Sequence, residues 1–510
     1  MPSPAQAVLL SWSIPPAATF ALALTALIYL RGWLLLRRAG VPFVPPWRAG
    51  SFLLGLLSLW IALASPFDTF SGFLLTAHML QHMMLMMVAP PLLLMGAPLV
   101  PLVRGLPVFA AREFAGPFLN WRLAARIGNA LVRPAVALVI MGVAMFAWHT
   151  PRLYELALAS SSWHEFEHAC FFLASLIFWW PVINPWPSPH LKAPKAGAPG
   201  VPSRSERPRW IMVPYLLIGD LQNTVLSAIF VFGDRVLYPS YITAPRIFGL
   251  PALADQIAAG AIMWVMGSTV FLIPATVIAV QCLSSRRPSP AMVTRSKTQS
   301  FDAVFAIGRG LSFAPRMLRS RFRASTVEAI TFVTVFVAAG LCLAALASGG
   351  SDDDDVALRV SQLSGPFIVS VFALPGDLDA GRSQFSVLVQ DRDTLQVMQD
   401  ADVELQATQA GAPQSMATVR ASSDDSENKL LQAADVELPS AGEWTLQIRV
   451  AHDGQDSGLA LPLRVVNPEA GVTIQWWYVV FVVFAGILGF TYWRRHRVPR
   501  TVPGRVLQPD

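Results

Sequence analysis

Charged residues are scarce in this chain: only 14% of its 510 residues are Asp, Glu, Lys or Arg. Soluble globular proteins carry roughly 25%. Hydrophobic residues make up 54%, which excludes an intrinsically disordered chain, because disorder requires low hydrophobicity. Cysteine is scarce as well, and Cys170, Cys282 and Cys342 are too far apart for a disulfide framework or a Cys-x-x-Cys redox motif. The composition therefore predicts an integral membrane protein.

Long apolar runs are abundant and predict an α-helical polytopic membrane protein. A helix that crosses the membrane needs about 20 largely apolar residues. The first run is followed by Arg37 and Arg38 and has no basic segment before it, so we expect a retained helix and not a cleaved signal peptide. Nine segments reach or approach the required length: residues 14–36, 50–66, 73–95, 134–149, 166–183, 210–232, 256–281, 326–347 and 474–493.

The distribution of Lys and Arg among the loops predicts the orientation in the membrane. The loops after the first, third, fifth and seventh spans and the C-terminal tail are basic, whereas the short loops between them hold at most two basic residues each. We therefore expect the N-terminus outside, the C-terminus in the cytoplasm, and residues 348–473 outside. The formal net charge of +6 then reflects the orientation of the chain in the membrane. We expect the basic inner loops to contact anionic lipid and expect no nucleic-acid partner.

Residues 348–473 differ in composition from the rest of the chain. From Ser351 to Gln475 there are 20 acidic and 7 basic residues. Short alternating runs separated by turn signals predict a small extracytoplasmic β-sandwich between the last two helices; they cover 367–374, 384–390, 403–406, 444–450 and 459–466. The expected order is a seven-helix membrane domain (1–285), a basic cytoplasmic loop (286–325), a helix (326–347), the acidic domain (348–473), a helix (474–493) and a basic tail (494–510).

Five of the eight histidines lie in or beside the predicted spans. They form two pairs with a spacing of four residues and one single residue: His78 and His82, His164 and His168, and His149. A spacing of four puts both members of a pair on one face of a helix, and the predicted topology puts all five at one depth in the outer leaflet. Because ionisable residues at membrane depth are costly and usually functional, we expect a shared metal or haem site.

The residues around the first pair favour copper. After His82 the third span continues Met83-Met84-Leu85-Met86-Met87, and imidazole with thioether ligands suits copper, Cu(I) above all. Met86 lies four residues after His82, so it extends the same helical face. We therefore expect Met86 as a further ligand.

Three alternatives remain open from the residues alone. The stretch His164-Glu165-Phe166-Glu167-His168 matches the H-E-x-x-H motif of zinc proteases, with Glu165 as the general base, although no further motif nominates a third ligand. Histidines from two helices can also hold a haem b axially in a membrane redox protein. A copper permease is the third alternative, with Asp220 and the Met-rich span along its path.

Four polar residues are also predicted within the membrane: Gln81, Asp220, Asp255 and Gln256. Asp220 falls near the middle of the sixth span, far from a helix terminus, so we expect it to face the bundle interior and to be hydrogen-bonded or protonated. Asp255 and Gln256 open the seventh span. For Asp68, at the end of the second span, we expect placement at a helix N-terminus or an interface.

These motifs, in this order, resemble the CtaG-like family of cytochrome c oxidase assembly factors. The resemblance covers roughly residues 15–285. The motifs are His78-Met-Leu-Gln81-His82, Ala89-Pro90-Pro91, Trp148-His149-Thr150-Pro151-Arg152-Leu153-Tyr154, His164-Glu-Phe-Glu-His168, Phe178-Trp179-Trp180-Pro181, and Asp255-Gln256 followed by Ala259-Gly260 and Met263-Trp264.

The resemblance implies a non-enzymatic protein of the bacterial cytoplasmic membrane that serves assembly of haem–copper oxidase, with copper delivery from the outer face. It also implies that the five histidines are copper ligands. The added outer domain resembles YtkA-like or FixH-like modules. This resemblance rests on the run Phe367–Leu374 and the turn Pro375-Gly376. The partners implied are cytochrome c oxidase subunits and an extracytoplasmic copper chaperone.

Overall fold

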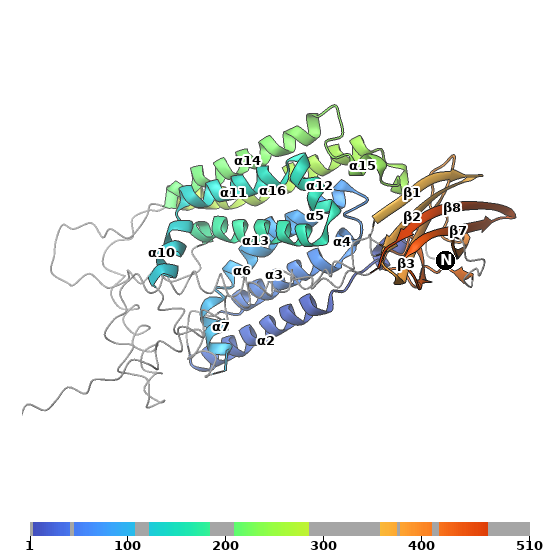
Figure 1. The fold of residues 1–510 in the computed structure, drawn as a ribbon. Helices are drawn as coiled ribbons and strands as arrows, with labels where there is room; N and C mark the ends of the chain where they lie inside the picture. Colours follow the sequence, from blue (N-terminus) through green and yellow to red (C-terminus); the bar gives the residue numbers. More distant parts are fainter. Residues whose placement is uncertain are drawn as a thin grey trace, which may run out of the picture.

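Figure 1 shows a bundle of long helices with a two-sheet β domain at one end. The computed structural model describes residues 4–40, 45–107, 122–183, 209–284, 357–374, 378–410 and 418–467. Within these ranges six helices are long and apolar enough to cross a membrane, and a pair bent by 70° makes a seventh span if it counts as one. The predicted helices 326–347 and 474–493, the loop 286–325 and the tail 494–510 lie outside the described residues.

The helices coincide with the first seven predicted spans. They are α2 (Pro16–Arg38), α3 (Pro46–Ala64) with α4 (Pro66–Thr69), α5 (Leu75–Met83) with the π-helix η1 (Met84–Val88) and α6 (Ala89–Met95), the bent pair α11 (Pro134–Trp148) and α12 (Pro151–Ala159), α13 (Ser161–Ile183), α14 (Met212–Phe232) and α16 (Ala252–Ser284). Five of these helices begin on a proline, whose fixed φ suits the first helical position. Shorter elements are α1 (Pro4–Leu10), α7 (Leu99–Gly105), α10 (Arg122–Leu131), α15 (Ser240–Thr243), η3 (Arg209–Ile211) and η4 (Ile247–Gly249).

The β domain consists of two antiparallel four-stranded sheets, ordered β1-β2-β3-β6 and β5-β4-β7-β8. Their inner faces share one apolar core, so a two-sheet β domain is confirmed, whereas its extracytoplasmic side and its place between two helices stay predictions. All five predicted runs are strands, whereas β1, β5 and β6 were not predicted. The bounds are β1 (Ala357–Ser364), β2 (Phe367–Leu374), β3 (Gly381–Asp391), β4 (Asp402–Gln409), β5 (Val419–Arg420), β6 (Gln432–Leu438), β7 (Gly442–His452) and β8 (Gln455–Val465).

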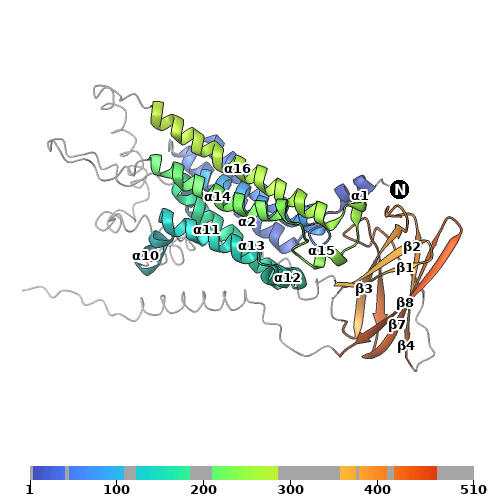
Figure 2. The same ribbon diagram turned by 90° about the horizontal axis from the view of Figure 1, so that it is seen from above.

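The outer face of the β1-β2-β3-β6 sheet packs against the helical bundle. Phe372 of β2 contacts Phe73, with ring centres 5.4 Å apart, and the Gln390 amide donates to the carbonyl of Arg246 at 3.0 Å. An apolar cluster joins the two parts through residues that each contributes: Ala7, Phe70, Ala77, Ile247, Phe372, Leu388, Leu430 and Leu431. The other sheet faces away from the bundle, and Figure 2 shows the same arrangement from above.

The end of the bundle next to the β domain is called the histidine pole here. It is formed by the first residues of α5, α13 and α16, the last residues of α11 and α14, and the segments α12 and α15, which Figures 1 and 2 both place beside the β domain. Because successive long helices run in opposite directions, these ends lie at the same end of the bundle. The bundle therefore gathers the five predicted histidines at one pole. The side of the membrane that this pole faces stays a prediction.

Candidate metal centre

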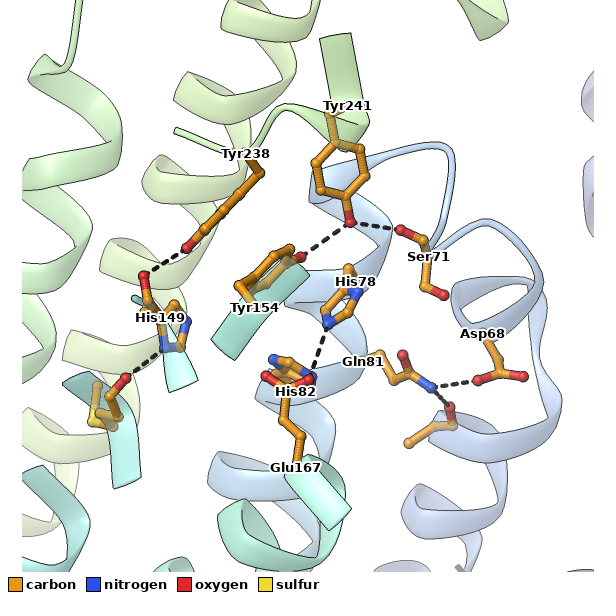
Figure 3. Close-up of polar contacts among 12 residues, drawn as sticks. Asp68, Ser71, His78, Gln81, His82, His149, Tyr154, Glu167, Tyr238 and Tyr241 are labelled. Atoms are coloured by element: carbon orange, nitrogen blue, oxygen red, sulfur yellow. Dashed lines mark hydrogen bonds and ion pairs between the residues drawn. The ribbon is translucent and has the colours of Figure 1, made fainter. Parts of the chain in front are cut away.

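Four side chains converge at the histidine pole and can hold a metal ion. They are His78 and His82 of α5 and His164 and Glu167 of α13, and one ligand atom from each lies within 4.8 Å of all the others. His78 and Glu167 are fully buried, and His82 is 2% exposed. Figure 3 shows Glu167 rising from its helix toward His78 and His82. Three predicted histidines are thus brought together with a carboxylate that was not among the predicted ligands.

The remaining two histidines border this group. His168, one turn after His164, is 4% exposed, and its ring centre lies 5.3 Å from that of His82. The ring centre of His149 lies 6.5 Å from that of His82. Its Nδ1 lies 2.7 Å from the carbonyl of Met145, so this nitrogen is the one that carries the proton and Nε2 stays open as a ligand.

The polar atoms at this centre lack hydrogen-bond partners, although Glu167 Oε2 lies 3.9 Å from Nε2 of His78. In the described part of the chain, neither ring nitrogen of His78 or His82 has a hydrogen-bond partner, nor does either carboxylate oxygen of Glu167. The Nε2 atoms of His149, His164 and His168 are buried and unpartnered as well. Buried polar groups are ordinarily hydrogen-bonded, and leaving one unpaired costs about 1–3 kcal/mol. A bound cation would supply a partner for the lone pairs among these atoms.

Two prolines explain how α5 and α13 are fixed against each other. The carbonyl of Met86 would accept from residue 90 in an α-helix and from residue 91 in a π-helix, but both positions are proline and have no N–H. The hydroxyl of Ser175 on α13 donates to this carbonyl instead. The same region is π-helical from Met84 to Val88, a form often found at functional sites. Ser175 therefore links the two histidine-bearing spans about two helical turns beyond His168.

The position of Met86 differs from the expectation in one respect. The spacing of four residues from His82 to Met86 assumes a regular α-helix. Met86 instead lies in the π-helix, whose turn contains an extra residue. The side chain of Met86 is 3% exposed and belongs to the apolar core of the bundle. Its role as a ligand stays a prediction.

Asp255 fixes the start of α5. Its carboxylate accepts from the backbone N–H groups of Leu75 at 2.6 Å and Thr76 at 3.2 Å, and from the Thr76 hydroxyl at 2.5 Å. These are the N–H groups that a helix leaves unsatisfied at its N-terminus. Asp255 thus acts from α16 as the cap of the helix that carries His78 and His82, and does not join the cluster itself.

The other predicted polar residues hold neighbouring segments in place. Gln81 donates to Asp68 at 2.6 Å and to the carbonyl of Ala62 at 3.0 Å. Gln256 accepts from the N–H of Leu237 at 2.8 Å and so fixes the loop after α14. Asp220 is half-buried between α14 and α16, where the Ser268 hydroxyl donates to it at 2.7 Å. Asp220 thus has a hydrogen-bond partner, and its orientation toward the bundle interior stays a prediction.

Three tyrosines that were not predicted as site residues cover the cluster on the side of the β domain. Tyr154 of α12 lies 5.0 Å from His78 and stacks on Tyr238 at 3.7 Å, measured between ring centres. The hydroxyl of Tyr241 donates to the carbonyl of Ser71 at 2.7 Å and meets that of Tyr154 at 3.0 Å. Burial raises the pKa of Tyr241 well above its usual value, so this hydroxyl stays neutral. Figure 3 shows the three rings around His78 and His149.

Relatives of the chain occur in mycobacteria. An uncharacterized protein of Mycobacterium leprae is 28% identical over 246 residues, which are 46% of this chain and 34% of that protein. Uncharacterized proteins of Mycobacterium bovis and Mycobacterium tuberculosis are each 28% identical over 184 residues, 36% of this chain and 28% of theirs. The chain thus spans about a third or less of the length of these relatives. No solved structure matches it.

A family match covers the whole histidine pole. The family is described as the cytochrome c oxidase caa3 assembly factor, and it matches residues 27–285, half of the chain. The β domain has no family assignment, so its likeness to YtkA-like or FixH-like modules stays a prediction. The matched residues include every helix that contributes a histidine, the proline pair after η1 and the capping Asp255. By this match the chain belongs to the cytochrome c oxidase caa3 assembly factor family.

Proposed function

We propose that the protein binds copper, as Cu(I), at the histidine pole and delivers it to haem–copper oxidase during assembly. The observation that carries this proposal is the convergence of His78, His82, His164 and Glu167 within 4.8 Å, with their buried polar atoms unpaired in the described chain. Family membership supplies the link to oxidase assembly, in a family of assembly factors and not of known enzymes.

The donor set supports a transition metal. Imidazole suits zinc, copper, iron and nickel, whereas magnesium and calcium require mostly oxygen ligands. Five histidines and one carboxylate therefore favour the first group. Copper is chosen among these metals because the oxidase that the family serves is a copper enzyme and because methionines follow the first histidine pair in the sequence.

The spacing of the rings supports a bare ion in preference to haem. Two imidazoles on opposite faces of a haem iron have ring centres roughly 6 Å apart, because each iron–nitrogen bond is about 2.0 Å long. The centres of His78 and His164 are 5.0 Å apart, and those of His82 and His168 are 5.3 Å apart. His82 and His149 reach 6.5 Å, but the ring of Phe171 lies 4.8 Å from His82 and 5.7 Å from His149.

The geometry also weakens the protease alternative. Glu165 would be the general base of the H-E-x-x-H motif, but the carboxylate among the converging ligand atoms is that of Glu167. Three residues after His164, Glu167 lies on the same face of α13 as both histidines. A carboxylate in contact with the ion acts as a ligand, which suits storage and transfer of a metal.

Delivery requires a partner that reaches the histidine pole. In the proposed topology this pole and the β domain face the extracytoplasmic side, with the basic inner loops against anionic lipid. We propose that an extracytoplasmic copper chaperone or an oxidase subunit approaches the pole from this side of the membrane. Cu(I) would then pass by exchange of one imidazole for a ligand of the partner.

The test combines metal analysis with oxidase assembly. Copper content is measured for the purified full chain and for His78→Ala/His82→Ala, and each is expressed in a strain that lacks the wild-type gene. We expect at least a tenfold loss of bound copper and an oxidase that lacks copper in the variant strain. His452→Ala, a histidine of the β domain, is the matched control and should change neither.

Two results would overturn the proposal. Unchanged copper content in the double variant would remove the site, and normal copper in the oxidase of the deletion strain would remove the function. Size-exclusion profiles in detergent show whether the variant has kept its fold, and His78→Gln/His82→Gln repeats the measurement with polar side chains if the alanine variant aggregates.

A further inference from the structure

The cluster contains more ligand residues than one ion uses. Copper(I) and zinc in proteins bind at most four ligands in most sites, whereas six side chains with unpaired, buried donor atoms gather at the histidine pole. They are His78, His82, His149, His164, Glu167 and His168. A single ion held by His78, His82, His164 and Glu167 would leave His149 and His168 buried beside it with unused Nε2 atoms.

The histidines form two layers, because each helix contributes two residues one turn apart. The first layer is His78 of α5 with His164 of α13, whose ring centres are 5.0 Å apart. The second layer is His82 with His168, at 5.3 Å. Two imidazoles bound to one tetrahedral ion through bonds of about 2.0 Å have ring centres roughly 5 Å apart. Each layer therefore has the spacing that one ion requires.

The separation of the layers fits a pair of ions. The ring centres of His78 and His82 are 4.3 Å apart, and those of His164 and His168 are 4.1 Å apart. Two-metal sites in proteins hold their ions about 3.5–4 Å apart. The spacing between layers thus matches the spacing of neighbouring metal ions.

Glu167 lies between the layers. The same carboxylate oxygen, Oε2, is 3.9 Å from Nε2 of His78 and 4.0 Å from Nε2 of His82. These distances are too long for hydrogen bonds and leave the oxygen equally near to both layers. A fully buried carboxylate between two cations also has its negative charge compensated, which burial otherwise makes unfavourable.

His149 adds a ligand on the side of the second layer. The carbonyl of Met145 binds its Nδ1 at 2.7 Å, which is the arrangement of histidines that ligate metals through the other nitrogen. The ring centre of His149 is 6.5 Å from that of His82, about 1.5 Å more than the roughly 5 Å of two imidazoles on one tetrahedral ion, so His149 would reach the second ion after a small shift of its ring.

We propose that the histidine pole holds two metal ions, one in each layer, bridged by Glu167. His78 and His164 bind the first ion, and His82, His168 and His149 bind the second. This inference rests on the proposed metal-binding function and goes beyond it in the number of ions. A pair of sites one helical turn apart gives an ion a second position within the protein before it is handed on.

The test is the stoichiometry of Cu(I) in the detergent-purified full chain, measured by competition with a coloured Cu(I) chelator. We expect two equivalents for the wild type, one for His149→Ala/His168→Ala, and two for the control His452→Ala. His149→Gln/His168→Gln provides the same comparison if the alanine variant fails to give a monodisperse protein.

The outcomes separate this inference from the proposed function. One equivalent in the wild type, unchanged in the His149 and His168 variants, would overturn the second site and leave the function standing. No bound copper at all would overturn both. A second readout uses Cu(II): the wild type should show an EPR signal well below two spins per chain because the bridged ions couple, and Glu167→Gln should restore more of the signal. Two full spins in the wild type would contradict the bridge.

Discussion

The β domain and the histidine pole differ in how many of their buried polar groups have hydrogen-bond partners. In the β domain, the amide of Gln432 donates to two carbonyls, including that of Ala401 at 2.7 Å, and the hydroxyls of Ser361 and Ser370 bond to each other across the strands at 2.8 Å. At the histidine pole, six adjacent side chains have buried nitrogen or oxygen atoms without a hydrogen-bond partner among the described residues.

The difference separates a scaffold from a binding site. Polar groups that hold elements in place are paired, as Asp255 and Ser175 are around the cluster itself. Unpaired buried polar atoms also occur singly elsewhere, as at Ser227 and Ser383, but at the histidine pole six side chains that have them lie together. The comparison therefore makes a distinction that can be measured: removing a paired group should destabilise the metal-free protein, and removing an unpaired one should not.

Asp255→Ala should have the largest effect. It removes the cap of α5 and leaves the N–H groups of Leu75 and Thr76 buried without acceptors, which corresponds to about 3 kcal/mol of lost stability. Thermal unfolding in detergent measures it, with the exposed Asp234→Ala as control. Equal melting temperatures for the two variants would show that α5 does not depend on this cap.

Ser175→Ala should come next, at about 2 kcal/mol, because the carbonyl of Met86 then has no donor. Since Ser175 sets the contact of α13 with the Met86 segment, copper affinity should also fall. Ser58→Ala is the matched control: its hydroxyl donates to Leu54 within its own helix at 2.8 Å and links no other helix. If both variants lost copper equally, the contact would not be what positions the histidines.

His168→Leu should have a small effect of the opposite sign. An apolar side chain replaces an unpaired ring nitrogen, so the metal-free protein should be as stable as the wild type or more stable by up to about 1 kcal/mol. The rise in melting temperature on adding Cu(I) should shrink in the same variant. If His168→Leu lost as much stability as Ser175→Ala, His168 would be a residue that holds the fold together and not a metal ligand.

Arg449→Gln should have the smallest effect. Arg449 and Asp456 form an ion pair at 2.5 Å, but both side chains are at least half exposed, and solvent screens such pairs. We expect a melting temperature within experimental error of the wild type at low and high salt. A salt-dependent loss would mean that surface charge contributes to the stability of the β domain.

The sequence predicts the helices and the histidines well, because both depend on local patterns. Apolar length sets the spans, and the spacing of four sets the faces of α5 and α13. Glu167 was overlooked because the H-E-x-x-H motif drew attention to Glu165, whereas helical periodicity alone places residue 167 beside His164 and His168. Strand β6, which reads Gln-Ala-Ala-Asp-Val-Glu-Leu, was missed because alanine and acidic residues are weak strand formers.

Contacts between distant segments had no signal in the sequence. Nothing local shows that the cap of α5 comes from α16, or that Phe372 on the outer face of the sandwich meets Phe73 of the bundle. The three tyrosines lie on two separate segments, and only the fold brings them over the histidines. These features depend on tertiary arrangement, which residue periodicity does not encode.

The proline pair also makes one span depend on another. A segment that enters the lipid phase must satisfy its backbone polar groups, yet Pro90 and Pro91 leave the carbonyl of Met86 without a donor from its own helix. The donor, Ser175, is 89 positions later in the chain. The third span therefore has its full set of backbone hydrogen bonds only when the fifth span is packed against it.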